Sequence, residues 1–196
     1  MNGARRLWRV FPWDPAARDG EPFSATFVPG GQGRGRFDLP GRASGVLYAA
    51  EGPEHAVAEM IQRFRNQPAP LEMDDLVVAG HALALVEVQV SAGLGGRIAN
   101  LCAPDLLARH GIAPDATAAR ERLTSQRVAE ALLAEGYAGL RWWSAFFGEW
   151  HTTVLFRERA AAGDLAYGTP VPLDLGHAAL REAARWLDVT VRQEHR

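Results

Sequence analysis

The sequence contains no lysine, so all 21 of its basic residues are arginine. A Schiff base to pyridoxal phosphate, a P-loop lysine on a nucleotide phosphate and a kinase-type lysine are therefore excluded. Any bound anion must be met by arginine or by backbone N–H groups, and the rigid arginine fork suits phosphate oxygens. Biased genome composition explains the arginine preference equally well, and we favour it for the bias as a whole.

The sequence also has few cysteines and lacks the histidine spacings that are typical of metal sites. The single Cys102 excludes an internal disulfide and a thiolate metal site. No activating base is close in sequence, so we expect Cys102 to be a buried small apolar residue rather than a nucleophile. The 6 histidines lack the HExxH and HxH spacings that bring two imidazoles to one ion, which predicts no metal.

Long apolar runs and an excess of positive charge are absent as well. No run approaches the roughly 20 residues of a membrane span, and the N-terminal residues lack an apolar segment typical of secretory signals. We therefore expect no membrane association and a cytoplasmic location. The formal net charge of −2 at pH 7 predicts no direct binding of nucleic acid.

The composition is that of an ordinary folded protein, with 196 residues, 47% of them hydrophobic and 22% charged, which predicts one domain over residues 1–196. Apolar patterning predicts strands over residues 5–12, 45–50, 86–90, 139–146 and 152–156. It predicts helices over residues 53–64, 104–110, 125–135 and 176–189, the last with Leu180, Ala183, Trp186 and Leu187 on its buried face. Their irregular order indicates an α+β fold.

The glycine-rich segment over residues 29–41 is the first candidate for a binding site. Its glycines allow backbone N–H groups to approach an anion, and Arg34, Arg36 and Arg42 lie within or beside it. The pattern is not the dinucleotide-binding fingerprint, because no strand leads directly into it and no helix follows. A flexible surface loop is the alternative interpretation.

Two further candidates are polar residues in apolar surroundings. Glu59 falls beside the apolar stripe of the helix that begins at Pro53, although glutamates at such edges are usually only solvated. Ser144 follows two tryptophans in a predicted strand. Neither a base nor a GxSxG elbow accompanies Ser144, so a hydrogen-bonding role is favoured over a nucleophilic one.

Short motifs that include these candidates occur in a fixed order along the chain. They are Leu7–Val10, Gly35–Phe37, Val46–Ala49, Ala56–Glu59, Thr124–Gln126, Glu135–Leu140 and Ser144–Ala145. In order and spacing the set resembles the RES domain family, which is named for its arginine, glutamate and serine. The resemblance extends from about residue 7 to about residue 156, which is most of the chain.

The resemblance implies an α+β, ADP-ribosyltransferase-like fold with a central mixed β-sheet flanked by helices. It also implies the toxin of a bacterial toxin–antitoxin pair, which degrades NAD+ by cleaving the nicotinamide–ribose bond as an NAD+ phosphorylase or an NAD+ glycohydrolase. NAD+ is then the substrate, no cofactor is expected, and inorganic phosphate is the co-substrate of the phosphorylase. The expected partner is a cognate Xre-like helix-turn-helix antitoxin.

Carried over position by position, the resemblance assigns catalysis to Glu59, Arg36 and Tyr48, and NAD+ binding to Arg9, Arg36, Tyr48 and Ser144. Glu59 is expected to hold ribose hydroxyls and to stabilise the positive charge that develops on the ribose. Both arginines are expected to bind the pyrophosphate, with orientation of phosphate as an alternative for Arg36. Tyr48 is expected to stack on nicotinamide or bond the ribose, and Ser144 to position the amide or the ribose.

Two segments depart from the family pattern. Phe37 stands where tryptophan is common, and residues 148–152 replace a glycine-containing turn followed by asparagine. The acceptor therefore stays open, and a mono-ADP-ribosyltransferase that modifies a protein is one alternative activity. A catalytically idle module that binds nucleotide or antitoxin is the other. Residues after Phe156 lie outside the matched motifs and are expected to complete the core, with self-association or antitoxin contact as alternatives.

Overall fold

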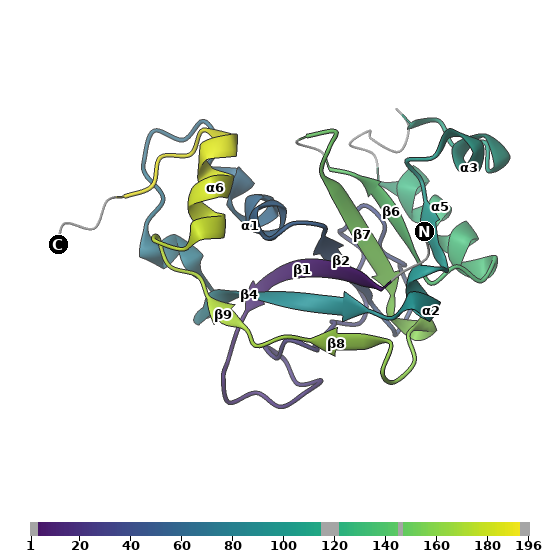
Figure 1. The fold of residues 1–196 in the computed structure, drawn as a ribbon, viewed down its shortest axis with the longest axis horizontal. Coiled ribbons are helices and arrows are strands. Elements are labelled where there is room, and N and C mark those ends of the chain that lie inside the picture. Colours follow the sequence, from purple (N-terminus) through teal and green to yellow (C-terminus); the bar gives the residue numbers. More distant parts are fainter. Residues whose placement is uncertain (1–3, 115–121, 145–146, 193–196) are drawn as a thin grey trace. The chain divides into compact units, whose positions relative to one another are not determined.

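The computed structural model describes residues 4–114, 122–144 and 147–192 (Figure 1). The chain divides into two compact units that interleave along the sequence. The first unit comprises residues 1–6, 28–49 and 89–166, and the second comprises residues 7–27, 50–88 and 167–196. The expected single domain over residues 1–196 stays a prediction.

The first unit contains a mixed sheet. Its strands are β2 (Val46–Ala50), β5 (Ile98–Asn100), β6 (Gly139–Trp143) and β7 (His151–Phe156), in the hydrogen-bonded order β2-β7-β6-β5. Strands β6 and β7 are antiparallel, with Trp143 opposite His151, whereas β5 and β6 are parallel, with Ile98 opposite Gly139. A parallel pair needs a long crossover connection. Helices occupy that connection here.

Helix α5 packs against the sheet of the first unit. The remaining elements of this unit are α2 (Ala92–Gly95), α3 (Pro104–Arg109), α5 (Leu123–Ala134), the 3-10 helix η3 (Arg157–Arg159) and β8 (Leu165–Tyr167). Ala129, Leu132 and Leu133 are buried at helical spacing, and α5 packs against β6 (Figure 1). Gly136, with φ +90°, ends the helical path in a conformation that favours glycine, as its sequence position predicts.

The glycine-rich segment forms turns and bends without a helix or strand. Phe37 and Leu39 nevertheless belong to the hydrophobic core of the first unit, and each is only 3% exposed. The loop prediction is confirmed, but the flexible-surface interpretation is wrong at these two residues. Two buried apolar side chains fix this stretch of the segment to the core.

The second unit contains its own strands and two longer helices. They are β1 (Arg5–Pro12), β3 (Val77–Val78), β4 (His81–Val90), β9 (Val171–Pro172), α1 (Pro53–Ile61), α6 (Ala178–Leu187) and the 3-10 helices η1 (Gln62–Phe64) and η2 (Met73–Leu76). Strand β4 pairs antiparallel with both β3 and β9. Strand β1 pairs antiparallel with β2 at Trp8 and Ala50.

Helices α1 and α6 pack against each other in the second unit (Figure 1). Pro53 in the first turn of α1 suits a position whose N–H has no helical partner. Leu180, Ala183 and Leu187 of α6 are buried as predicted. Trp186 was expected on this face and is instead 52% exposed, because its indole N–H donates to Glu182 on the outer face of the helix at 2.9 Å.

Some predicted boundaries and burial states are wrong. The strand expected to begin at residue 86 begins at His81, since Leu83, Ala84 and Leu85 before Val86 form a buried apolar run rather than an alternation. The strand expected over residues 139–146 ends at Trp143, and residues 145 and 146 lie outside the described residues. Cys102 is partly exposed rather than buried, because it lies in the turn before α3, where its N–H donates to Asn100.

The helix expected over residues 53–64 is shorter than predicted. Helix α1 ends at Ile61 and continues only as η1, so the predicted apolar stripe is incomplete. Met60 and Phe64 are partly exposed, whereas Ala56, Val57 and Ile61 are buried. Among the described residues, no helix combines the length and the apolar composition needed to cross a membrane.

Candidate functional site

Glu59 lies at the edge of the buried face of α1. Ala58 and Ile61 on either side of it are buried, while 37% of the Glu59 side chain is exposed. One turn earlier on the helix, His55 is only 1% exposed, and its Nε2 lies 3.2 Å from Glu59 Oε1. The side-chain amide of Gln62 donates to the Glu59 carbonyl oxygen at 3.0 Å. The carboxylate is thus oriented from within the helix and remains accessible to a ligand.

Arg9 lies on β1 and is tied to the backbone of the same unit. Its Nη1 donates to the carbonyl oxygens of Ala25 and Phe27, both at 3.0 Å, and its guanidinium carbon lies 5.1 Å from the centre of the Phe11 ring. Burial lowers the pKa of Arg9, partly offset by Tyr167. The group stays cationic at neutral pH because arginine starts from a very high pKa. Arg9 therefore holds the backbone of residues 25–27 and supplies a partly buried positive charge.

Arg36 lies in a turn formed by residues 35–38, called the Arg36 turn below. The buried Asp38 carboxylate accepts from the Gly35 N–H at 2.6 Å and from the Tyr48 hydroxyl at 2.8 Å. The Tyr48 hydroxyl oxygen accepts from the Phe37 N–H at 2.9 Å. The backbone on both sides of Arg36 is therefore held by hydrogen bonds.

Helix α5 holds the opposite side of the Arg36 turn. The buried Ser125 hydroxyl donates to the Arg36 carbonyl oxygen. The Gln126 side-chain amide donates to the carbonyl oxygens of Gly33 at 3.1 Å and Gly35 at 3.0 Å. Arg42, another arginine near the segment, instead forms an ion pair with Glu158 at 3.4 Å. The part of the glycine-rich segment around Arg36 is therefore anchored to both β2 and α5.

Tyr48 is a half-buried residue of β2 that packs against the core of the first unit. Burial raises the pKa of its hydroxyl, and the negative charge of Asp38 raises it further. The phenol therefore stays protonated at neutral pH and donates to Asp38. This makes a general-base role unsuitable for Tyr48.

Ser144 is buried at the end of β6 in the first unit. Its N–H donates to the Trp150 carbonyl oxygen at 2.7 Å, which closes the connection between β6 and β7. Ala145, the second residue of this motif, lies outside the described residues.

The predicted site residues thus occupy several elements. Arg36, Tyr48 and Ser144 belong to the first unit, where Arg36 and Tyr48 meet at the Arg36 turn. Arg9 and Glu59 belong to the second unit, on β1 and α1.

The sequence interpretation missed three residues that position Arg36 and Glu59. Asp38, Gln126 and His55 were not singled out, although each lies within four residues of a predicted site residue or in a quoted motif. The sequence signal was available for His55, since residues four apart on a helix face each other. Asp38 carries the same kind of signal, because an acidic side chain can reach back to a backbone N–H three residues earlier, as in a capping box.

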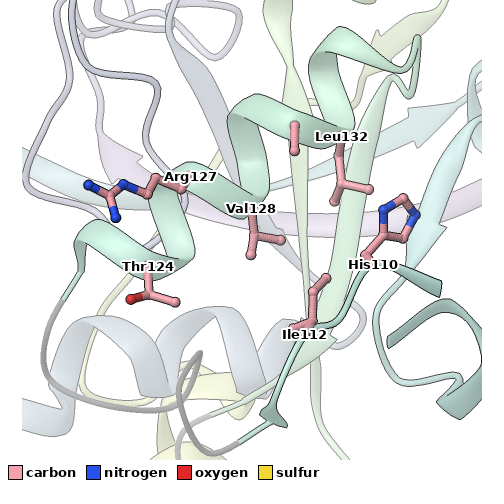
Figure 2. Close-up of a pocket in the computed structure, with 7 residues that line it drawn as sticks. His110, Ile112, Thr124, Arg127, Val128 and Leu132 are labelled. Atoms are coloured by element: carbon pink, nitrogen blue, oxygen red, sulfur yellow. The ribbon is translucent and has the colours of Figure 1, made fainter. Parts of the chain in front are cut away.

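A pocket of about 250 Å³ lies elsewhere in the first unit, beside α5 (Figure 2). Its lining is mainly apolar, with His110 and Arg127 among the polar members. His110 Nδ1 lies 3.2 Å from Glu135 Oε1. None of the predicted site residues lines this pocket. We therefore do not assign the predicted chemistry to it.

Comparison with known proteins identifies the family. Among curated proteins, none matches the chain. Among solved structures, a chain of the M. tuberculosis MbcT-MbcA toxin–antitoxin complex is similar, with a TM-score of 0.62 and 18% identity over 95% of this chain and 88% of that chain. The likeness confirms the expected α+β, ADP-ribosyltransferase-like fold with a mixed sheet flanked by helices. A family model described as RES domain matches residues 6–176, and the chain therefore belongs to the RES domain family.

Proposed function

We propose that this RES domain protein is the toxin of a bacterial toxin–antitoxin pair and an enzyme that cleaves the nicotinamide–ribose bond of NAD+. The acceptor of ADP-ribose in this proposal is inorganic phosphate or water. The observation that carries the proposal is the family match over residues 6–176, which contains Arg9, Arg36, Tyr48, Glu59 and Ser144. NAD+ is the substrate, and the reaction needs no further cofactor.

The environment of Glu59 supports a role in the chemical step. Departure of nicotinamide leaves positive charge on the ribose, so a fixed carboxylate stabilises the transition state more than the ground state. Glu59 is partly exposed and is oriented by His55 at 3.2 Å. In this proposal it also accepts hydrogen bonds from the ribose hydroxyls.

The arginines supply the positive charge that a pyrophosphate requires. The Arg36 turn fixes the backbone of Arg36, whose guanidinium can donate two parallel hydrogen bonds to phosphate oxygens. The charge of Arg9 is partly withdrawn from water, which strengthens its attraction to an anion. We assign both to the pyrophosphate of NAD+, with orientation of inorganic phosphate as the alternative for Arg36.

Tyr48 and Ser144 complete the proposed substrate-binding set. The Tyr48 hydroxyl is already engaged by Asp38 and Phe37, which favours contact of its ring with nicotinamide over a bond to the ribose. Ser144 offers a hydroxyl at the end of β6, suited to the carboxamide or the ribose.

The proposed partner is a cognate antitoxin of the Xre-like helix-turn-helix class. The similar solved structure is described as a toxin–antitoxin complex, which supports a partner of this kind. Copurification of the chain with the product of an adjacent small gene, and loss of NAD+ consumption in that complex, are the expected results. Full activity in the complex would contradict inhibition by that partner.

Purified protein incubated with NAD+, with and without inorganic phosphate, tests the activity when the products are resolved by mass. Nicotinamide with ADP-ribose 1″-phosphate identifies a phosphorylase, and nicotinamide with free ADP-ribose identifies a hydrolase. Glu59→Gln is expected to abolish most turnover, whereas Glu54→Gln on the same helix is the matched control and is expected to retain it.

Survival of NAD+ in both reactions refutes the proposal. Transfer of ADP-ribose to an added protein would then indicate a mono-ADP-ribosyltransferase. Binding of NAD+ without any reaction would indicate an idle binding module.

A further inference from the structure

Asp38 holds the backbone on both sides of Arg36, directly on one side and through Tyr48 on the other. One oxygen accepts from the N–H of the preceding residue, Gly35, at 2.6 Å. The other accepts from the Tyr48 hydroxyl at 2.8 Å, and that hydroxyl in turn accepts from the N–H of the following residue, Phe37, at 2.9 Å. Asp38 and Tyr48 together close a ring of hydrogen bonds around the Arg36 backbone.

We propose that Asp38 is a positioning residue that acts through Arg36, holding the turn so that the guanidinium meets the pyrophosphate or phosphate group of its ligand in a fixed position. This inference rests on the proposed function and adds to it a residue outside the predicted site. Asp38 itself need not touch the substrate.

The burial of Asp38 argues that the ring is built for this purpose. The residue is only 3% exposed, and a buried carboxylate is costly unless its oxygens accept hydrogen bonds. Here one oxygen accepts from the turn itself, and the other accepts from the Tyr48 hydroxyl that also bonds the turn. A local turn without a ligand-binding task needs no buried charge, since an apolar side chain would fix it at lower cost.

The surroundings of the ring remove most of the remaining freedom of this backbone. Phe37 is anchored in the core, and Ser125 and Gln126 of α5 bond the carbonyl oxygens of Arg36 and Gly35. An arginine on a loosely held loop loses conformational entropy when it binds an anion. On a backbone that is already fixed, much of that loss is avoided.

Gly35 provides an independent indication that the ring is tightly closed. A Cβ at this position would overlap an Asp38 carboxylate oxygen and lie 2.5 Å from the Tyr48 hydroxyl oxygen. Only glycine therefore allows the carboxylate and the phenol to approach this N–H together. Gly35→Ala is expected to open the ring without changing any polar side chain.

The test is a double-mutant cycle between Asp38 and Arg36, measured as kcat and KM for NAD+. Asp38→Asn keeps the size of the side chain but replaces one accepting oxygen with an amide nitrogen. We expect kcat/KM to fall roughly 10- to 100-fold in the wild-type background, the range typical of a misplaced binding group. In an Arg36→Ala background the same change is expected to cost less than about twofold, because the residue that it positions is gone.

Tyr48→Phe is a second, milder way to break the ring of hydrogen bonds, since it removes only the hydroxyl and keeps the aromatic side chain. It is expected to show the same dependence on Arg36. The matched controls are Asp164→Asn and Tyr137→Phe. Asp164 also bridges a hydroxyl and a backbone N–H, at 2.6 Å and 2.9 Å, and Tyr137 also packs against the core of the first unit. Both controls are expected to retain wild-type kinetics, and thermal unfolding checks that every variant is folded.

The outcomes separate this inference from the proposed function. Equal losses from Asp38→Asn in the two backgrounds, or no loss in either, overturn the positioning role. If the wild-type protein leaves NAD+ intact, the proposed function fails, and the cycle is then measured as binding of inorganic pyrophosphate by calorimetry. Affinity that depends on Asp38 only when Arg36 is present upholds the inference in that case. Affinity independent of either residue, or the absence of binding, overturns it.

Discussion

The contact between His55 and Glu59 predicts a specific pattern of activity in two His55 variants. In glutamine the amide nitrogen lies the same number of bonds from Cβ as Nε2 does in histidine, whereas in asparagine it lies one bond closer. His55→Gln can therefore still donate to Glu59, whose Oε1 lies 3.2 Å from Nε2 in the native protein. His55→Asn cannot reach it. We expect the glutamine variant to retain near-native kcat and the asparagine variant to lose activity.

The size of the loss follows from the exposure of Glu59. A hydrogen bond contributes about 0.5–1.5 kcal/mol net, and the lower part of that range applies because 37% of the Glu59 side chain is exposed. At about 1.36 kcal/mol for each tenfold change in rate, a contribution of about 0.5–1 kcal/mol corresponds to roughly a two- to fivefold decrease in kcat. KM for NAD+ is expected to change less, since in the proposed function the contact orients a group that acts in the transition state.

Initial rates of nicotinamide release at saturating NAD+ provide the assay, with thermal unfolding measured in parallel. Equal activity in both variants and the wild type would refute the orienting role of His55. Equal impairment of both variants would also refute it, because loss of the buried ring would then account for the effect.

Three further predictions concern stability and protonation. Leu132→Ala in the core is expected to destabilise the protein by about 2–5 kcal/mol in urea unfolding, whereas Leu123→Ala, 51% exposed on the same helix, should change it by less than about 0.5 kcal/mol. The hydrogen bond from the Ser91 hydroxyl holds the pKa of Asp164 below its usual 3.8. The stability that this ionised carboxylate contributes at neutral pH is therefore lost as the pH falls through and below 3.8. Ser91→Ala should make this loss smaller when the free energy of unfolding is measured against pH. Burial raises the pKa of Tyr48, so its phenol should stay protonated while the protein is folded. The wild type and Tyr48→Phe should therefore show the same tyrosinate absorbance when the folded proteins are titrated with base. A smaller signal in the variant would show that Tyr48 ionises in the folded protein and would contradict the raised pKa.

Local sequence patterns were sufficient to predict most of the regular structure. Pro53 marks the start of α1, Gly136 ends the path of α5, and the apolar spacing of α5 matches its buried face. Local patterns failed where tertiary packing decides the outcome. The first half of β4 was missed because Leu83, Ala84 and Leu85 are all buried, so this stretch has no alternation to detect.

The candidate site could be predicted only in part, for a related reason. Arg36 and Glu59 follow from ordered motifs, and their positions need no knowledge of long-range contacts. The residues that hold the Arg36 turn come from distant places in the chain, since Tyr48 lies on β2 and Gln126 lies on α5. Which backbone atoms such side chains meet is decided by the fold, so a single sequence contains no direct signal for it.

Helix α5 serves two purposes at once, because its C-terminal half fills the core while Ser125 and Gln126 near its start hold the Arg36 turn. A densely packed interior transmits small displacements instead of absorbing them. Repacking beneath Leu132 that shifts α5 by a fraction of an ångström would therefore also move the arginine that the helix supports. Conservative substitutions in this part of the core are therefore expected to change how firmly Arg36 is held, and with it the affinity for an anionic ligand, even where they lie far from that ligand.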